Sequence, residues 1–263
     1  MRIVWRRDLI RFTTDRMRIA MMLIQPLLFL FVLGAGLQTL AAASTDGVDL
    51  KTFIFPGILC MALVFSAMFN AISLVMDREF GFLREMLVAP VRRSSIVVGK
   101  CLGGATVASL QGVILLALAG FVDVPYDPVL LLGLFGLQLL IAFTVTAFGV
   151  MVAVRIKQIQ TFTTVMQMLV MPLFFLSGAL YPVSGLPTWL EVLTRLNPLT
   201  YAVDPMRRLV FNHLDISEAA RRALDPGVTW FGWRVPTLLE VGIVLALGLA
   251  MMAVAISQFT RTE

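Results

Sequence analysis

Long apolar runs separated by short polar segments dominate the pattern of the chain. A helix that crosses the hydrocarbon core of a bilayer needs about 20 mostly apolar residues. Runs near or above that length occupy residues 19–40, 53–76, 96–122, 128–154, 162–180 and 235–258. None of them alternates polar and apolar residues as a membrane β-barrel strand does. Because lipid offers backbone amides no partners, each run is predicted to be a helix. The sequence therefore predicts an all-α, polytopic membrane protein with six transmembrane helices.

The composition favours a membrane protein over a soluble one. The chain has 263 residues, of which 59% are hydrophobic and 14% are charged, and its mean hydropathy is +0.91. Soluble domains are about a quarter charged. We interpret residues 1–263 as one transmembrane domain. Residues 19–180 hold five helices, residues 181–234 form a long extracytoplasmic loop, and residues 235–258 hold the sixth helix.

The distribution of charge predicts the orientation. The net charge is +5 and the pI is about 9.8, but in a membrane protein an excess of Lys and Arg marks the cytoplasmic segments rather than nucleic-acid binding. Lys and Arg gather in residues 1–18, 77–100 and 155–157 and recur at Arg261, whereas the short loops on the other side carry only Lys51. Both termini are therefore predicted to be cytoplasmic. Residues 181–234 also carry arginines, but long loops largely escape this rule.

The first 18 residues interleave arginines with apolar side chains. This pattern predicts an amphipathic helix at the cytoplasmic interface, with its apolar side in lipid and its basic side toward anionic headgroups. A simple basic flank of the first membrane helix is the alternative. The residues assigned to the interfacial helix are Trp5, Leu9 and Phe12.

The long loop also has helical patterns. Residues 186–196 and 205–211 fit short helices that begin at prolines, and the Asn-Pro pair between them is typical of a helix break. These helices are predicted to lie in the outer leaflet and to cover the outer end of the bundle. The residues assigned to this outer cap are Pro187, Trp189, Asn197, Pro198 and Tyr201.

Residues 77–100 form a charged segment between two apolar runs. Charged and apolar residues at helical spacing, ended by Pro90, predict a short amphipathic helix in the cytosol. Aromatic anchors flanked by charges suit docking into a groove on a soluble partner; a solvated helix without a partner is the alternative. The residues assigned to docking are Asp77, Arg78, Glu79, Phe80, Gly81, Phe82, Leu83, Arg84 and Glu85.

Signals of catalytic chemistry are sparse in the sequence. It has a single histidine, His213, and no GxxxxGK[ST] phosphate-binding loop. No catalytic residue, metal ligand or bound cofactor is therefore predicted. Glu240 is the ionisable residue that we place inside an apolar run, and it is predicted to pair with Arg207, Arg208 or Arg234 rather than to relay protons.

Neutral polar residues inside the runs, Gln111 and Gln138 among them, either join helices or line a passage. Helix joining is favoured. Prolines in a membrane helix free a carbonyl group and permit a kink, so two of them join the candidate passage. The residues assigned to passage lining are Gln25, Pro26, Asn70, Gln167 and Pro172.

Several stretches carry a resemblance to a known family. They are DREFGFLREMLVAPV at residues 77–91, followed by Gly99-Lys100, and FFLSGALYP at 174–182, followed by PTWL at 187–190 and NPLTYAVD at 197–204. These stretches resemble ABC-2 type permeases of the daunorubicin-exporter and nodulation-type group. The resemblance keeps its order and spacing over nearly the whole chain.

The resemblance implies a permease subunit of an ATP-driven ABC exporter in the cell membrane of a prokaryote. Such a subunit pairs with a second copy of itself, or with a related permease, and with two ATP-binding ABC subunits that hold ATP and Mg. The family's coupling helix corresponds to residues 79–85 and its N-terminal amphipathic segment to residues 5–12. Expected cargo is amphiphilic, drug-like or lipid-linked; membrane lipids are expected partners and nucleic acid is not. An ion-coupled secondary carrier and a membrane scaffold are the alternatives.

Overall fold

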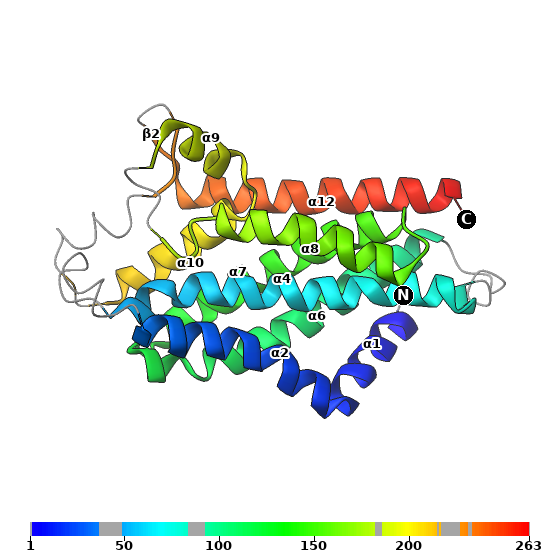
Figure 1. Cartoon of the computed structure of the whole chain (residues 1–263), viewed down its shortest axis with the longest axis horizontal. Helices are drawn as coiled ribbons and strands as arrows, with labels where there is room; N and C mark the ends of the chain where they lie inside the picture. Colours follow the sequence, from blue (N-terminus) through cyan, green and yellow to red (C-terminus); the bar gives the residue numbers. More distant parts are fainter. Residues whose placement is uncertain are drawn as a thin grey trace.

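The computed structural model describes residues 2–36, 49–83, 93–181, 186–214, 216, 227–230 and 233–262. Most of them belong to long helices that run side by side along one axis (Figure 1). In chain order the elements are α1 (Arg2–Thr14), α2 (Arg16–Leu28), the π-helix η1 (Phe29–Leu33), α4 (Leu50–Glu79), α6 (Arg93–Leu116), the 3-10 helix η2 (Ala119–Val122), α7 (Pro128–Ala153), α8 (Ile159–Phe175), α9 (Thr188–Leu196), α10 (Thr200–Asn212), β1 (Thr229–Trp230), β2 (Trp233–Arg234) and α12 (Thr237–Thr262). The two strands pair as a small antiparallel hairpin that the sequence did not predict.

Five helical segments within the described residues are long and apolar enough to cross a membrane. They are Ile19–Gly36, Leu50–Glu79, Arg93–Leu116, Pro128–Ala153 and Thr237–Arg261. This confirms the prediction of an all-α, polytopic membrane protein. Helix α8 is also apolar but has only 17 residues, at the lower limit for a span, so the count of six remains a prediction.

Helix α8 is shorter than the apolar run at residues 162–180 predicted. It ends at Phe175, and Gly178 has a positive φ of 71°, a conformation that glycine adopts without strain. Two of the last helical carbonyls accept side-chain hydrogen bonds: Ser177 Oγ donates to Phe174 O at 2.6 Å and Asn197 Nδ2 to Leu173 O at 2.6 Å. The helix therefore ends where side chains of Ser177 and Asn197 bind its last carbonyl groups.

Helix α4 is the centre of the bundle and packs against α2, α6, α7, α8 and α10. In lipid, helices associate mainly by close packing of small residues, and the described contacts follow that rule. Gly104 of α6 faces Thr146 of α7, and Gly149 of α7 faces Ala71 of α4. At each glycine a Cβ atom would overlap its neighbour, so these helices approach closely because side chains are missing.

Helix α2 contains Pro26 and passes directly into the π-helix η1. Because proline has no N–H, the carbonyl of Met22 loses its helical partner. Gln111 of α6 replaces that partner, with Nε2 donating to Met22 O at 3.1 Å. Gln111 therefore joins two helices, as favoured for the polar residues inside the runs.

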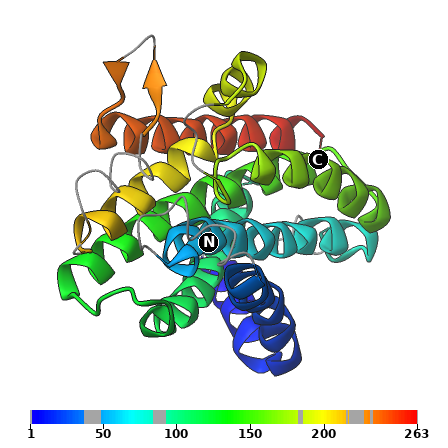
Figure 2. The ribbon, with the colours of Figure 1, turned by 60° about the vertical axis from the view of Figure 1, so that its left-hand side comes forward.

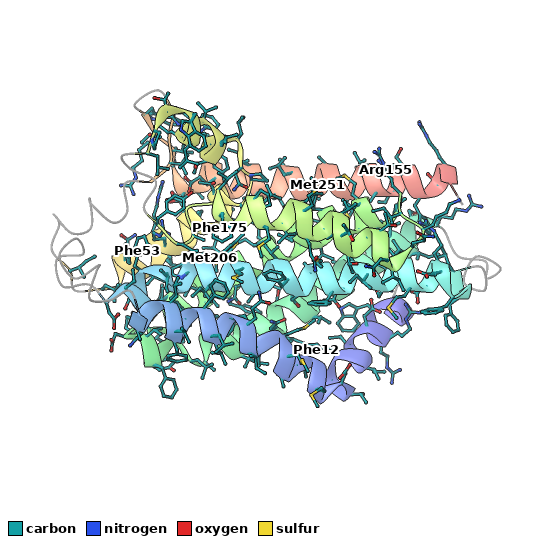
Figure 3. All side chains as sticks on the ribbon, viewed as in Figure 1. Phe12, Phe53, Arg155, Phe175, Met206 and Met251 are labelled. Atoms are coloured by element: carbon teal, nitrogen blue, oxygen red, sulfur yellow. The ribbon has the colours of Figure 1, made fainter. Side chains whose placement is uncertain are left out.

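The two ends of the bundle differ. The start of α1, the last turn of α4 and the end of α12 lie toward one end, here called the α1 end, and α9 and the hairpin lie toward the other, the α9 end (Figure 1). Figure 2 shows α9 and the hairpin projecting on the same side, past α12. Helix α10 packs between α4, α7 and α12 at the α9 end, near the labelled Phe53 and Met206 in Figure 3. Both chain termini thus lie toward the α1 end.

Candidate functional site

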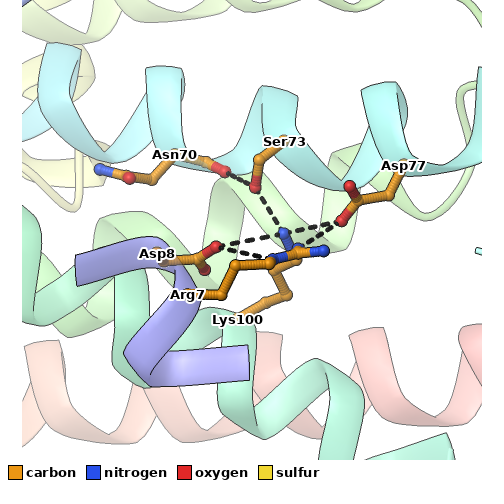
Figure 4. Close-up of polar contacts among 6 residues, drawn as sticks. All are labelled: Arg7, Asp8, Asn70, Ser73, Asp77 and Lys100. Atoms are coloured by element: carbon orange, nitrogen blue, oxygen red, sulfur yellow. Dashed lines mark hydrogen bonds and ion pairs between the residues drawn. The ribbon is translucent and has the colours of Figure 1, made fainter. Parts of the chain in front are cut away.

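A cluster of charged side chains joins three helices at the α1 end (Figure 4). Asp77, in the last turn of α4, is only 2% exposed. Its Oδ2 atom lies 2.7 Å from Nη2 of Arg7 on α1 and 3.0 Å from Nζ of Lys100 on α6. One carboxylate oxygen therefore receives charged hydrogen bonds from two helices, and such bonds are stronger than those between neutral groups.

Two further side chains complete this group. Lys100 Nζ donates to Ser73 Oγ at 2.7 Å, and Asp8 Oδ1 lies 3.7 Å from Lys100 Nζ. We call Arg7, Asp8, Ser73, Asp77 and Lys100 the Asp77 cluster. Its two cations and two carboxylates balance, which a buried group requires because an uncompensated charge in a low dielectric is costly.

The position of α1 depends on a glycine. A Cβ atom on Gly103 of α6 would lie 2.9 Å from Oδ2 of Asp8, so the missing side chain allows Asp8 to approach α6. Helix α1 therefore approaches α6 closely at Gly103.

The two residues after Asp77 bind the connection between α7 and α8. Arg78 Nη1 donates to Val154 O at 3.0 Å and to Ile156 O at 2.9 Å, at the C-terminal end of α7. Glu79 Oε2 accepts a hydrogen bond of 2.8 Å from the amide of Ile159, the first residue of α8. A cation at a helix C-terminus and a carboxylate at an N-terminus both complement the unpaired backbone groups there. The end of α4 is thus fixed to α7 and α8 as well.

These contacts revise where the predicted helix of residues 77–85 begins, whereas docking of this segment on a partner stays a prediction. Asp77, Arg78 and Glu79 belong to the last turn of α4, not to a separate helix, and their side chains contact their own chain. The helix breaks just afterwards, where Gly81 has a φ of 83°. Leu83 is buried, and Arg84 and Glu85 lie outside the described residues.

Two of the residues assigned to docking are exposed aromatics. Phe80 is 62% exposed and Phe82 is 52% exposed. They lie on either side of Gly81, directly after the anchored end of α4. Among the described residues of the charged segment, these phenyl rings are the large apolar groups available to a partner.

Helix α1 is only partly as predicted. Phe12 is buried, and α1 packs against α6, so this part of its apolar side contacts protein instead of lipid. Leu9 is half-buried. Trp5 remains exposed and donates from Nε1 to Thr106 Oγ1 at 3.1 Å. The amphipathic pattern was correct, but sequence alone could not tell protein from lipid as its apolar neighbour.

The residues assigned to a passage are not gathered in one place. Gln25 is exposed on α2, Gln167 and Pro172 are exposed on α8, and Pro26 is buried at the kink. Asn70 is half-buried and borders an open cavity of about 550 Å³ that polar and apolar side chains both line, next to Asp8 and Ser73 of the Asp77 cluster. The passage assignment thus remains a prediction.

The outer-cap residues divide into two groups. Pro187 and Trp189 are exposed and Pro198 is half-buried. Asn197 and Tyr201 are buried and hold the cap together. Asn197 Nδ2 satisfies the end of α8, and the Tyr201 hydroxyl donates to Arg195 O at 2.7 Å and accepts from Trp230 Nε1 at 2.9 Å. Tyr201 therefore links α9, α10 and the hairpin.

The arginines of the long loop also have structural contacts. Glu240 is fully buried and its Oε1 lies 3.2 Å from Nη2 of Arg208, which confirms the predicted pairing. Arg207 is buried too: its Nη2 donates to Gly178 O at 2.6 Å, and its guanidinium carbon lies 4.4 Å from the ring centroid of Phe53. The role of Arg207 was not predicted.

No group of three or more His, Cys, Asp or Glu side chains in the described ranges is placed to hold a metal ion. The site consists of ion pairs, helix-end contacts and exposed aromatic rings. These contacts connect the helices to one another, and the exposed rings present an apolar surface to a partner.

Comparison with known proteins identifies the family. The model of the ABC-2 type transporter family matches residues 1–211. The chain belongs to the ABC-2 type transporter family. The transport permease ycf38 of Cyanophora paradoxa is 32% identical over 191 residues, which cover 71% of this chain and 66% of that protein. The chain thus spans just under two thirds of that relative.

Two other relatives of this ABC-2 chain come from bacteria. Nodulation protein J of Rhizobium leguminosarum bv. trifolii is 30% identical over 216 residues, 80% of each chain. The multidrug ABC transporter permease YbhR of Escherichia coli (strain K12) is 29% identical over 164 residues, which cover 61% of this chain and 44% of that protein. The matches agree with the resemblance found in the sequence.

Proposed function

We propose that this ABC-2 protein is the permease subunit of an ATP-driven exporter in the cell membrane of a prokaryote. In this proposal it pairs with a second copy of itself and with two ATP-binding subunits that hold ATP and Mg. The observation that carries the proposal is the exposed Phe80–Phe82 pair, which directly follows an end of α4 attached to α1, α6, α7 and α8.

Aromatic residues, Phe among them, are enriched in protein–protein interfaces relative to the rest of the surface. Here two of them flank a glycine at the α1 end, where both termini also lie. A cytosolic ATP-binding subunit that binds these rings would transmit its own movement to α4. Because Asp77, Arg78 and Glu79 tie that end to four other helices, the movement would shift a group of helices together.

A second permease copy would cover apolar faces that remain exposed. Met21, Ile24 and Leu28 of α2 and Met168 and Met171 of α8 are exposed large apolar residues. In the proposal these faces meet across a seam through which cargo passes when the two copies shift between inward-facing and outward-facing arrangements. Apolar walls suit amphiphilic cargo, drug-like or lipid-linked, and the multidrug relative agrees with that class.

Co-purification tests the docking step. The permease is isolated from its native membranes and probed for a bound ATP-binding ABC protein. Phe80→Ala and Phe82→Ala should each reduce the bound amount about 30-fold, the effect of losing a hot spot of about 2 kcal/mol. Phe121→Ala is the matched control because Phe121 is 70% exposed and lies in η2, away from the docking segment. Equal retention by all three variants would remove the assignment.

Orientation needs its own test. Cysteine placed at Gly81 should react with a membrane-impermeant maleimide only in inside-out vesicles, whereas cysteine placed at the exposed Asp123 should react in intact cells. The two natural cysteines, Cys60 and Cys101, are buried and give a low background. Labelling of the Gly81 position in intact cells would place the docking segment on the wrong side for a cytosolic motor.

A further inference from the structure

An apolar cavity of about 290 Å³ lies inside the single chain, between α4, α7, α8, α10 and α12. Its lining includes Val64 of α4, Phe148 of α7, Leu169 of α8, Ala202 of α10 and Met251 of α12. Figure 3 shows Met251 along the middle of α12. The cavity is therefore built from five helices of one chain and is separate from the exposed α2 and α8 faces that the proposed seam uses.

The lining has almost no polar surface available to a ligand. Its one hydroxyl group, that of Thr144, already donates within the chain, where its Oγ1 lies 3.0 Å from Leu140 O and 3.0 Å from Val244 O. Water needs two to four polar partners to occupy a cavity, so water does not fill this one. Emptiness is also unfavourable, because lining atoms beside a void lose their dispersion contacts.

The rim shows where an occupant enters. Leu169 on α8 is 39% exposed and Met251 on α12 is half-buried, so the lining continues to the surface between these two helices. Helix α12 is a membrane span, and Leu245 and Leu249 on it are also exposed. The surroundings of the rim are therefore hydrocarbon, in which lipid acyl chains are the abundant molecules.

We propose that this cavity is a binding site for one acyl chain of a membrane phospholipid, with the headgroup remaining outside the bundle. The bound chain fills the space between α8 and α12 below Leu199 and Ala202. The bound chain thereby completes the packing between α8 and the helices α4, α7 and α12. This proposal does not depend on the identity of the ATP-binding subunit or of the cargo.

The test uses phospholipid that carries a photoreactive diazirine in the middle of one acyl chain. The protein is reconstituted in nanodiscs with this lipid, irradiated and digested, and cross-linked peptides are mapped by mass spectrometry. Wild-type protein should be labelled at cavity residues of α8 and α12. Native mass spectrometry after detergent exchange should find about one retained phospholipid per chain, because a buried acyl chain dissociates more slowly than surface lipid.

Two variants and a control make the result specific. Val64→Phe takes up part of the cavity and should reduce labelling and retention at least about tenfold, the effect of excluding two buried methylene groups. Phe148→Leu enlarges the cavity and should leave retention equal or raise it, which keeps the test informative if Val64→Phe does not fold. Val254→Phe makes the same change as Val64→Phe on the exposed surface of α12 and should have no effect.

Three outcomes would overturn the proposal. The first is labelling confined to exposed residues in the wild-type protein. The second is equal retention by the wild-type, Val64→Phe and Val254→Phe proteins. The third is a protein that retains no measurable phospholipid and whose labelling is competed away by free fatty acid. That result would assign the cavity to a different ligand.

Discussion

Replacing Asp77 by Asn removes one charge from the Asp77 cluster while keeping the shape of the side chain. Removing one partner of a buried ion pair typically costs 3–5 kcal/mol, because the other charge is left buried and unpaired. Here Lys100 is almost fully buried, but Asp8 at 3.7 Å still partly compensates it. Arg7 is 30% exposed and can turn toward solvent. We therefore expect Asp77→Asn to lower the free energy of unfolding by about 3 kcal/mol, the low end of that range.

A double-mutant cycle isolates the interaction from other effects of the substitution. Lys100→Met alone leaves Asp77 buried beside only one cation and should also cost about 3 kcal/mol. Asp77→Asn combined with Lys100→Met restores neutrality, because Arg7 and Asp8 remain. The double variant should therefore be less destabilised than the sum of the single variants, by about 2 kcal/mol, within the range measured for residues in one network.

The measurement is equilibrium unfolding in mixed lipid–detergent micelles, as sodium dodecyl sulfate is titrated and tryptophan fluorescence is followed. Trp5 reports on α1 because it donates to Thr106 of α6. Asp123→Asn is the control, since it makes the same chemical change at an exposed position. The reasoning fails if Asp77→Asn lies within about 0.5 kcal/mol of the wild-type protein, the usual range for surface changes, or if the two single effects add.

Two further predictions concern the rest of the bundle. Gly57→Ala should destabilise the protein by about 1–3 kcal/mol because its Cβ would overlap the carbonyl of Ala179, whereas Gly136→Ala, with nothing within 4 Å, should be neutral or slightly stabilising in the same unfolding titration. Tyr201→Phe removes two hydrogen bonds in the outer cap and should cost about 1–3 kcal/mol. The control Trp189→Phe, at an exposed position, should leave stability unchanged, and equal effects of the two changes would contradict the assigned role of Tyr201.

The fold class could be predicted from the sequence because the bilayer imposes a simple length and hydropathy condition on each helix. Helix ends were less predictable. The apolar run at residues 162–180 contains no charge that marks where α8 stops. The end at Phe175 depends on Asn197 and on the turn at Gly178, and Asn197 lies 24 residues beyond the carbonyl that it binds. Hydropathy does not contain that information.

The candidate site shows the same limit more strongly. The charged segment was recognised, and Phe80 and Phe82 are exposed as docking residues must be. The partners of Asp77 were not predictable: Arg7 is 70 residues away in the sequence, and Lys100 was counted as a loop charge although it lies within α6. Local pattern predicts which residues are charged and which face they occupy, whereas pairing across helices depends on tertiary contacts.

The long loop raises a related point about orientation. Its arginines oppose the positive-inside count, yet Arg195, Arg207 and Arg208 each bind a carboxylate or a backbone carbonyl group within the fold. An arginine that is neutralised or buried in the folded loop presents little charge to the membrane surface. Three arginines of the loop thus have contacts within the fold, and the orientation of the chain stays a prediction.

The contacts at the end of α4 also show which residues of the charged segment are held in place. Upstream of Gly81, Asp77 is held by α1 and α6, and Arg78 and Glu79 are held by the α7–α8 connection. Gly81 itself has no neighbour that would meet a Cβ atom, and its φ is 83°. Downstream of Gly81, Leu83 is 2% exposed and belongs to the hydrophobic core. The exposed rings of Phe80 and Phe82 thus lie between two anchored points. In the proposed function, a partner that binds both rings would therefore act on the attached end of α4.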